Sequence, residues 1–135
     1  GFPGETRADF QILMDFVRQV GFDHLGAFVY SDHPDLPSHR LDGHVPAATA
    51  RGRRDRLMQL QLDISQGLLR RRRGQTCDVL IEAAPEPGLR EGRTRFQAPE
   101  VDGVTYVRGG HSAVGAICPV VVTDSLEYDL IGEPG

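Results

Sequence analysis

The sequence has 135 residues, of which 39% are hydrophobic and 25% are charged, proportions typical of a folded domain rather than a disordered chain. No apolar run reaches the ~20 residues of a membrane span, and the two cysteines are too few for a disulfide framework. We therefore expect a cytoplasmic protein. Residues 1–74 hold eleven arginines and nine acidic residues, whereas residues 75–135 hold four arginines and ten acidic residues. The second half of the chain is thus strongly acidic.

The first predicted element is a helix over residues 7–20. Thr6 and Asp9 have the spacing of a capping box, and Gly21 suits the left-handed residue that ends a helix. Apolar residues recur between them at helical spacing and form one stripe: Phe10, Leu13, Met14, Val17 and Val20.

An apolar and aromatic run, HLGAFVYS, follows this helix and predicts a buried strand around residues 24–30. Helix and strand in this order indicate part of an α/β unit. Residues 31–46 are rich in proline and predict a loop. Their histidines, His33, His39 and His44, are irregularly spaced and have no cysteine nearby, so we expect solvated side chains and no metal site.

A second helix is predicted over residues 47–71. Its stripe consists of Leu57, Leu60, Gln61, Ile64 and Leu68, and four arginines are expected on its exposed side: Arg51, Arg53, Arg54 and Arg56. The run Arg70–Arg73 stabilises the helix C-terminus through the helix dipole, and Gly74 ends the helix. The run is either a solvated helix end or a phosphate contact.

Beyond Gly74 the apolar period changes from helical to two. Five short segments separated by Gly and Pro turns predict a small antiparallel β-barrel: CDVLIEA, RTRFQ, VTYVR, ICPVVVT and YDLIG. In the fourth segment Cys118, Val120 and Val122 are expected on one face and Pro119 on the other. Because proline cannot donate a ladder hydrogen bond, we expect an edge position or a local break at Pro119. Cys77 and Cys118 are interpreted as buried small hydrophobes.

Several longer motifs resemble one known family. GFPGET-x-x-DF, FDHLGAFVYS and RLMQLQLDIS are similar to the end of the radical SAM methylthiotransferase core, and RFQAPEVDGVTYV with VVVTDSLEYDLIGEP is similar to the TRAM domain of those enzymes. The resemblance implies three parts: residues 1–46 as the C-terminal end of a partial TIM-like barrel, 47–74 as a linker helix, and 75–135 as a five-stranded, OB-like TRAM barrel. It is nearer to the branch that modifies an aspartate of small-subunit ribosomal protein twelve than to the branch that modifies transfer RNA.

The resemblance also implies cofactors. Enzymes of this family use S-adenosylmethionine and two 4Fe-4S clusters, and the CxxxCxxC motif that holds the radical-generating cluster does not occur in this sequence. We therefore expect that this chain alone holds neither cluster, contributes no catalytic residue and is inactive by itself. What it retains by the resemblance is a piece of the S-adenosylmethionine wall: Gly1, Phe2, Pro3, Gly4, Glu5 and Tyr30.

The acidic second half predicts the kind of partner. An acidic barrel repels a phosphate backbone but attracts a basic ribosomal protein. The candidate contact residues are Glu100, Asp102, Glu127 and Asp129, at strand ends. Phe96, Tyr106 and Tyr128 could stack on RNA bases, but core or rim positions suit an acidic domain better. The alternative function is an RNA- or ribosome-binding adaptor without catalysis, which would use the arginine-rich helix; no membrane partner is expected.

Overall fold

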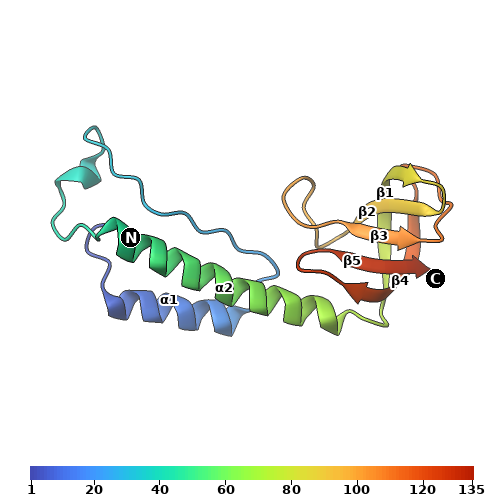
Figure 1. Ribbon diagram of the computed structural model, residues 1–135, viewed down its shortest axis with the longest axis horizontal. Helices are drawn as coiled ribbons and strands as arrows, with labels where there is room; N and C mark the ends of the chain where they lie inside the picture. The colour runs from blue at the N-terminus through green and yellow to red at the C-terminus, as the bar shows by residue number, and fades with distance from the viewer. The chain divides into compact units, whose positions relative to one another are not determined.

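The computed structural model describes residues 1–135 and shows two helices followed by a closed barrel of five strands (Figure 1). The chain divides into two compact units, Gly1–Ile64 and Ser65–Gly135, which are described separately below. The predicted architecture of helices followed by a small β-barrel is confirmed. Neither helix is long and apolar enough to cross a membrane.

Helix α1 (Arg7–Val20) forms as the sequence predicts, because both of its ends are capped. The Thr6 hydroxyl accepts a hydrogen bond from the Asp9 amide at 3.1 Å, and the Asp9 carboxylate accepts one from the Thr6 amide at 2.9 Å. Hydrogen bonding from Thr6 holds the pKa of Asp9 below its usual range. Gly21 ends the helix with a left-handed φ of 64°.

Residues 24–30 are extended but form no strand, so the prediction of a buried strand there is wrong. A strand is stabilised by ladder hydrogen bonds to a neighbouring strand, and the unit Gly1–Ile64 contains none. Phe28 is accordingly 94% exposed. The following loop contains one short 3₁₀ helix, η1 (Pro37–Arg40).

Helix α2 (Ala47–Arg71) has the predicted bounds, and its first part supplies the core of the first unit. Leu57 packs with the buried face of α1, and the Gln61 side chain donates to the carbonyl of Phe22 at 2.7 Å. The buried members of this cluster are Phe10, Met14, Val17 and Leu57. The apolar stripe predicted for α1 is therefore covered within the unit, except for Leu13 and Val20, which stay partly exposed.

The second unit is a barrel in which the strands close in the order β1-β2-β3-β5-β4. The strand bounds are β1 (Thr76–Glu86), β2 (Leu89–Thr94), β3 (Thr105–Arg108), β4 (Ile117–Ser125) and β5 (Leu130–Pro134). Four of the five pairings are antiparallel, but β3 and β5 pair in parallel, which differs from the wholly antiparallel barrel expected. The expected face is confirmed, because Val120 and Val122 are buried and Cys118 packs against the core.

Two details of the predicted strands are corrected. β2 lies several residues earlier than expected, directly after the Pro87-Gly88 turn, so that Phe96 and Gln97 follow the strand. Pro119 does not break β4, because it pairs with Asp78 of β1 within a continuous ladder. The Pro119 carbonyl accepts from the Gly135 amide, on the β5 side. Because the nitrogen and carbonyl of one strand residue point to the same side, the Pro119 nitrogen also points toward β5. The pairing of β4 with β5 ends there, at Val120 and Pro134. The missing donor therefore removes no ladder bond to β1.

Candidate functional site

The first five residues form a turn that lies against Tyr30, and these are the residues predicted to form the cofactor wall. The rings of Phe2 and Tyr30 meet edge to face, with their centroids 5.2 Å apart. The Gly4 amide donates to the carbonyl of Gly43 at 2.9 Å, and Gly4 has a φ of 87°, a conformation that favours glycine. Pro3 is buried beneath this turn. The structure thus brings the two predicted wall segments together.

Glu5 is already engaged within this unit. Its carboxylate lies 3.0 Å from the Arg53 guanidinium, which also donates to the Glu5 carbonyl at 3.0 Å, and its other oxygen accepts from the Gly1 nitrogen. Both side chains are largely covered, at 20% exposed for Glu5 and 12% for Arg53. Arg53 was expected on the exposed side of α2, and that expectation is wrong, because it pairs with Glu5 and lies near the Phe10 ring.

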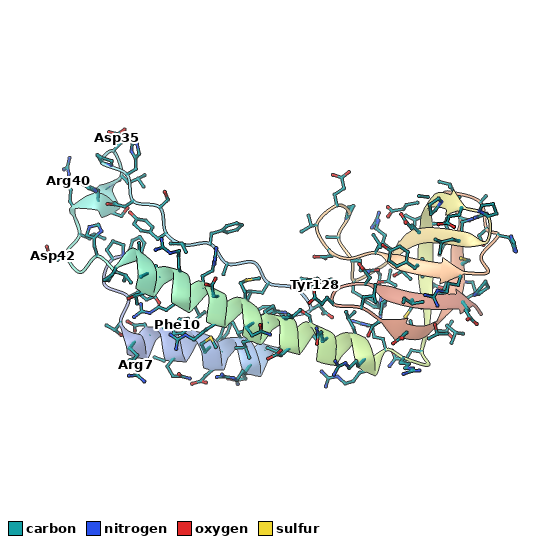
Figure 2. The ribbon with its side chains drawn as sticks, viewed as in Figure 1. Arg7, Phe10, Asp35, Arg40, Asp42 and Tyr128 are labelled. Atoms are coloured by element: carbon teal, nitrogen blue, oxygen red, sulfur yellow. The ribbon has the colours of Figure 1, made fainter.

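The loop of residues 31–45 is tied to Tyr30 through polar side chains. The Tyr30 hydroxyl lies 2.7 Å from the Ser38 hydroxyl, and the Asp32 carboxylate lies 2.8 Å from Nδ1 of His39. The hydrogen bond to His39 is the main cause that lowers the pKa of Asp32. Asp35, Arg40 and Asp42 mark the outer part of this loop in Figure 2. No group of three or more His, Cys, Asp or Glu side chains is arranged to hold a metal ion.

A small pocket opens beside this turn. It has a volume of about 120 Å³, and Glu5, Phe10, Phe28 and Arg53 are among the residues that line it. Sites for small molecules usually measure about 300–1,000 Å³. This pocket is therefore too small to enclose a nucleoside-sized ligand.

The four acidic residues predicted to contact a partner lie on two neighbouring loops of the barrel. One loop joins β2 to β3 and the other joins β4 to β5, and both leave the same end of the barrel (Figure 1). Contact between the loops is close, since a Cβ atom on Gly103 would lie 2.0 Å from the carbonyl oxygen of Tyr128. The structure therefore brings all four acidic residues to one end of the barrel.

Two of the four acidic side chains hold these loops in place. Asp129 accepts from the Val104 amide at 2.9 Å, which links the β4–β5 loop to the start of β3. Asp102 accepts from the Ala98 amide at 2.8 Å within the β2–β3 loop. Their roles are thus structural in this geometry, and both side chains are only partly exposed.

The other two acidic side chains are presented to solvent. Glu100 and Glu127 are both exposed, and Glu100 has a left-handed φ of 62°, an uncommon conformation for a non-glycine residue. Exposed apolar side chains accompany them: Val101 is 82%, Leu126 52% and Tyr128 38% exposed. Figure 2 labels Tyr128 at this end of the barrel. We call this surface, made of Glu100, Val101, Leu126, Glu127 and Tyr128, the acidic loop surface.

A buried glutamine that sequence reasoning missed supports this surface. The Gln97 side-chain oxygen accepts from the Thr94 amide at 2.9 Å and from the hydroxyls of Thr94 and Thr105 at 3.1 and 2.7 Å. Gln97 is only 4% exposed and so joins the end of β2 to the start of β3. Gln97 lies in the segment RTRFQ, which was predicted to be a strand, and nothing in that segment indicates a buried side chain that joins two strands.

Two of the three aromatic side chains considered for base stacking, Phe96 and Tyr106, are partly covered in the barrel. The guanidinium of Arg72 lies 3.6 Å from the centroid of the Phe96 ring. Tyr106 is half-buried, and burial, followed by the charges of Asp129 and Glu91, raises the pKa of its hydroxyl. Only Tyr128 belongs to an exposed surface.

Comparison with known proteins identifies the barrel and gives relatives of the whole chain. Residues 74–134 match the family model described as a TRAM domain. The chain is 53% identical over 134 residues to the ribosomal protein uS12 methylthiotransferase RimO of Desulfosudis oleivorans, a match that covers 98% of this chain and 30% of that protein. The RimO protein of Clostridioides difficile is 44% identical over the same shares of the two chains. The chain is RimO-like over nearly its whole length.

The RimO resemblance includes both candidate surfaces, because 98% of the chain is aligned. RimO of Sorangium cellulosum gives a similar result, with 43% identity and 28% of that protein covered. The chain spans about 30% of the length of the RimO proteins it matches. The resemblance to radical SAM methylthiotransferases that carry a TRAM domain, drawn from the motifs, is thus confirmed.

Proposed function

We propose that this chain is the substrate-recognition part of a uS12 methylthiotransferase, and that its barrel binds the basic ribosomal protein through the acidic loop surface. The observation that carries the proposal is that two of the four acidic side chains hydrogen-bond the loops and the other two are exposed to solvent. Asp102 and Asp129 fix the loops, so Glu100 and Glu127 are held out beside exposed apolar side chains. An apolar centre with charged groups at its edge is the usual composition of a protein interface.

Residues 1–5 and Tyr30 would supply one wall of the S-adenosylmethionine site. The aromatic contact between Phe2 and Tyr30 and the bracing of Glu5 by Arg53 support a rigid wall. S-adenosylmethionine supplies the radical chemistry of this family when it is bound. The small pocket does not enclose it, and no side-chain group here suits an iron-sulfur cluster.

The proposal is tested by binding the full chain to purified uS12. We expect binding that weakens as salt is raised, and we expect Glu100→Gln with Glu127→Gln to reduce the affinity at least about 10-fold, since two charge pairs at an interface are lost. The matched control is Glu86→Gln with Glu133→Gln, which removes the same charge from exposed strand positions elsewhere on the barrel. Equal losses in both pairs, or no binding at low salt, would overturn the proposal.

The RNA-binding adaptor is the alternative, and the charge distribution speaks against it. Residues 75–135 carry four arginines against ten acidic residues, which repels a phosphate backbone. The same experiment distinguishes the two functions when ribosomal RNA is offered in place of uS12. Tighter binding to RNA, with an affinity that falls steeply with salt and is unaffected by the Glu100 and Glu127 variants, would favour the adaptor.

A further inference from the structure

The loop of residues 31–45 contains two histidines gathered around one aspartate. Nδ1 of His39 lies 2.8 Å from the Asp32 carboxylate, and Nδ1 of His44 lies 3.9 Å from the same carboxylate. The two imidazole rings meet edge to face, with their centroids 6.1 Å apart. More than half of each of the three side chains is covered. Neither the proposed recognition of uS12 nor the proposed cofactor wall uses these three residues.

The surroundings of His44 suit an imidazolium ion. Its Nε2 atom lies 3.2 Å from the carbonyl oxygen of His39, and its Nδ1 atom faces the Asp32 carboxylate. A carbonyl and an ionised carboxylate only accept hydrogen bonds, and a neutral imidazole carries an N–H on one nitrogen alone. The His39 ring differs, because a neutral tautomer can make its bond to Asp32 through Nδ1. The charge of this cluster therefore depends mainly on His44.

The backbone beside His44 holds the turn at the start of the chain. The Gly43 carbonyl accepts from the Gly4 amide at 2.9 Å, and a Cβ atom on Gly43 would lie 3.4 Å from the Gly4 backbone. At the other end of the loop, the Asp32 carboxylate lies 3.4 Å from the Tyr30 hydroxyl. Attraction between His44 and Asp32 therefore draws together the two ends of the loop, each of which contacts a different segment.

We propose that the loop of residues 31–45 is a pH-sensitive strap, held closed while His44 is protonated and loosened when His44 loses its proton. An imidazole group changes its charge between about pH 5 and 8. Loss of the proton removes the charge attraction to Asp32, so that the Gly43 backbone keeps one restraint fewer. The strap should therefore be most firmly closed in mildly acidic solution and looser above neutral pH.

The charges around the cluster leave Asp32 as the partner of His44. The hydrogen bond from His39 is the main cause that lowers the pKa of Asp32 below 3.8, so this carboxylate stays ionised wherever an imidazole titrates. The other charged side chains of the loop and of the adjoining turn are Glu5, His33, Asp35, Arg40 and Asp42. Glu5 is paired with Arg53, and Asp35 lies 3.4 Å from His33. Arg40 and Asp42 have opposite charges and lie in the outer part of the loop (Figure 2).

The test follows the Gly4 amide and the Tyr30 ring of the full chain by NMR between pH 5 and 8. We expect both resonances to titrate together with the His44 ring. We also expect the protection factor of the Gly4 amide, which allows for the intrinsic effect of pH on exchange, to fall about 2- to 5-fold as the pH rises, because one exposed ion pair is lost. The readouts need neither uS12 nor S-adenosylmethionine, so the result does not depend on the proposed function.

Three variants examine the proposed geometry. His44→Gln stays neutral and Asp32→Asn removes the carboxylate, so each should show the lower Gly4 protection already at pH 5 and no further change up to pH 8. His33→Gln is the matched control, since it removes another imidazole that faces a carboxylate in the same loop, and it should keep the response of the wild type. All three positions are exposed, and the far-UV circular dichroism should be unchanged.

Three results would overturn the proposal. The first is a wild-type Gly4 amide that does not titrate with the His44 ring. The second is a His44→Gln or Asp32→Asn variant that keeps the pH response of the wild type. The third is a His33→Gln variant that loses this response, which would show that any charge in the loop has the same effect and that His44 is not the switch.

Discussion

Individual carboxylates of the barrel differ in function according to the atoms they contact. Asp129 accepts from a main-chain amide of another segment, whereas Glu127, two residues earlier, is exposed. A charge-assisted bond to a partly buried amide stabilises the folded state, while an exposed carboxylate contributes little. This pair of residues therefore separates the structural role of Asp129 from the recognition role that we propose for Glu127.

This difference predicts opposite results for two neighbouring substitutions. Asp129→Ala leaves the Val104 amide without its acceptor and should lower the free energy of unfolding by about 1–3 kcal/mol. Glu127→Ala should change it by less than about 0.5 kcal/mol. Urea unfolding followed by circular dichroism measures both, and amide hydrogen exchange at Val104 reports the local loss. Equal stability of the two variants would contradict the bracing role of Asp129.

Tyr106 gives a prediction in alkaline solution. Burial raises the pKa of its hydroxyl above the ordinary value of 10.0, so the folded state holds this proton more tightly than the unfolded chain does. The resulting stabilisation is complete below pH 10.0 and is lost as the pH rises through the raised pKa. The free energy of unfolding should therefore decline more steeply above this pH in the wild type than in Tyr106→Phe. Parallel curves for the two proteins would show that Tyr106 carries no such linkage.

Among the elements, α1 is the one whose stability depends most clearly on the residues at its N-terminal end. The Thr6 hydroxyl accepts from the Asp9 amide at 3.1 Å and forms one half of the capping box, whose other half is the Asp9 carboxylate bound to the Thr6 amide. Thr6→Ala should therefore lower the free energy of unfolding by about 1 kcal/mol, whereas Thr6→Ser, which keeps the hydroxyl, should change it by only a few tenths of that amount. Thermal unfolding followed at a helix-sensitive wavelength checks both. Similar losses for alanine and serine would mean that the hydroxyl does not cap the helix.

The elements that sequence reasoning predicts well are those whose stability comes from local signals. The bounds of α1 follow from Thr6 and Gly21, and the bounds of α2 from its apolar stripe and Gly74. The segment 24–30 was predicted wrongly because an apolar run shows that a segment can be buried but not that a partner strand exists. β2 was misplaced because its residues, LREGRT, are mostly polar. The Pro-Gly turn before it was the available signal.

The same reasoning explains how much of the candidate sites was predictable. The acidic residues could be proposed as contacts because charge is visible in the sequence. Which carboxylates bind a main-chain amide and which stay exposed depends on the tertiary structure. The pairing of Glu5 with Arg53 joins residues 48 positions apart. The Arg72–Phe96 contact likewise joins the residue that follows α2 to the loop that follows β2. Contacts of this kind depend on the tertiary structure, and the spacing of residues along the chain does not predict them.

At the scale of the whole molecule, each compact unit has its own buried core. Phe10, Met14, Val17 and Leu57 form the first, and the second includes Val79, Ile81, Val107 and Val120 inside the barrel. The division falls within α2, between Ile64 and Ser65, so one continuous helix contributes to both units. Separate cores favour separate unfolding transitions, whereas a shared helix favours coupling.

Two core substitutions decide between these possibilities. Leu57→Ala and Ile81→Ala each leave a cavity and should cost about 2–5 kcal/mol in the unit that contains them. We expect native-state amide exchange to accelerate throughout residues 1–64 in Leu57→Ala, while β1 and β4 keep their protection, and the reverse pattern in Ile81→Ala. This follows because none of the three buried clusters combines residues of the two units. If either substitution accelerates exchange equally in both units, α2 couples them into one cooperative structure and the two cores are not independent.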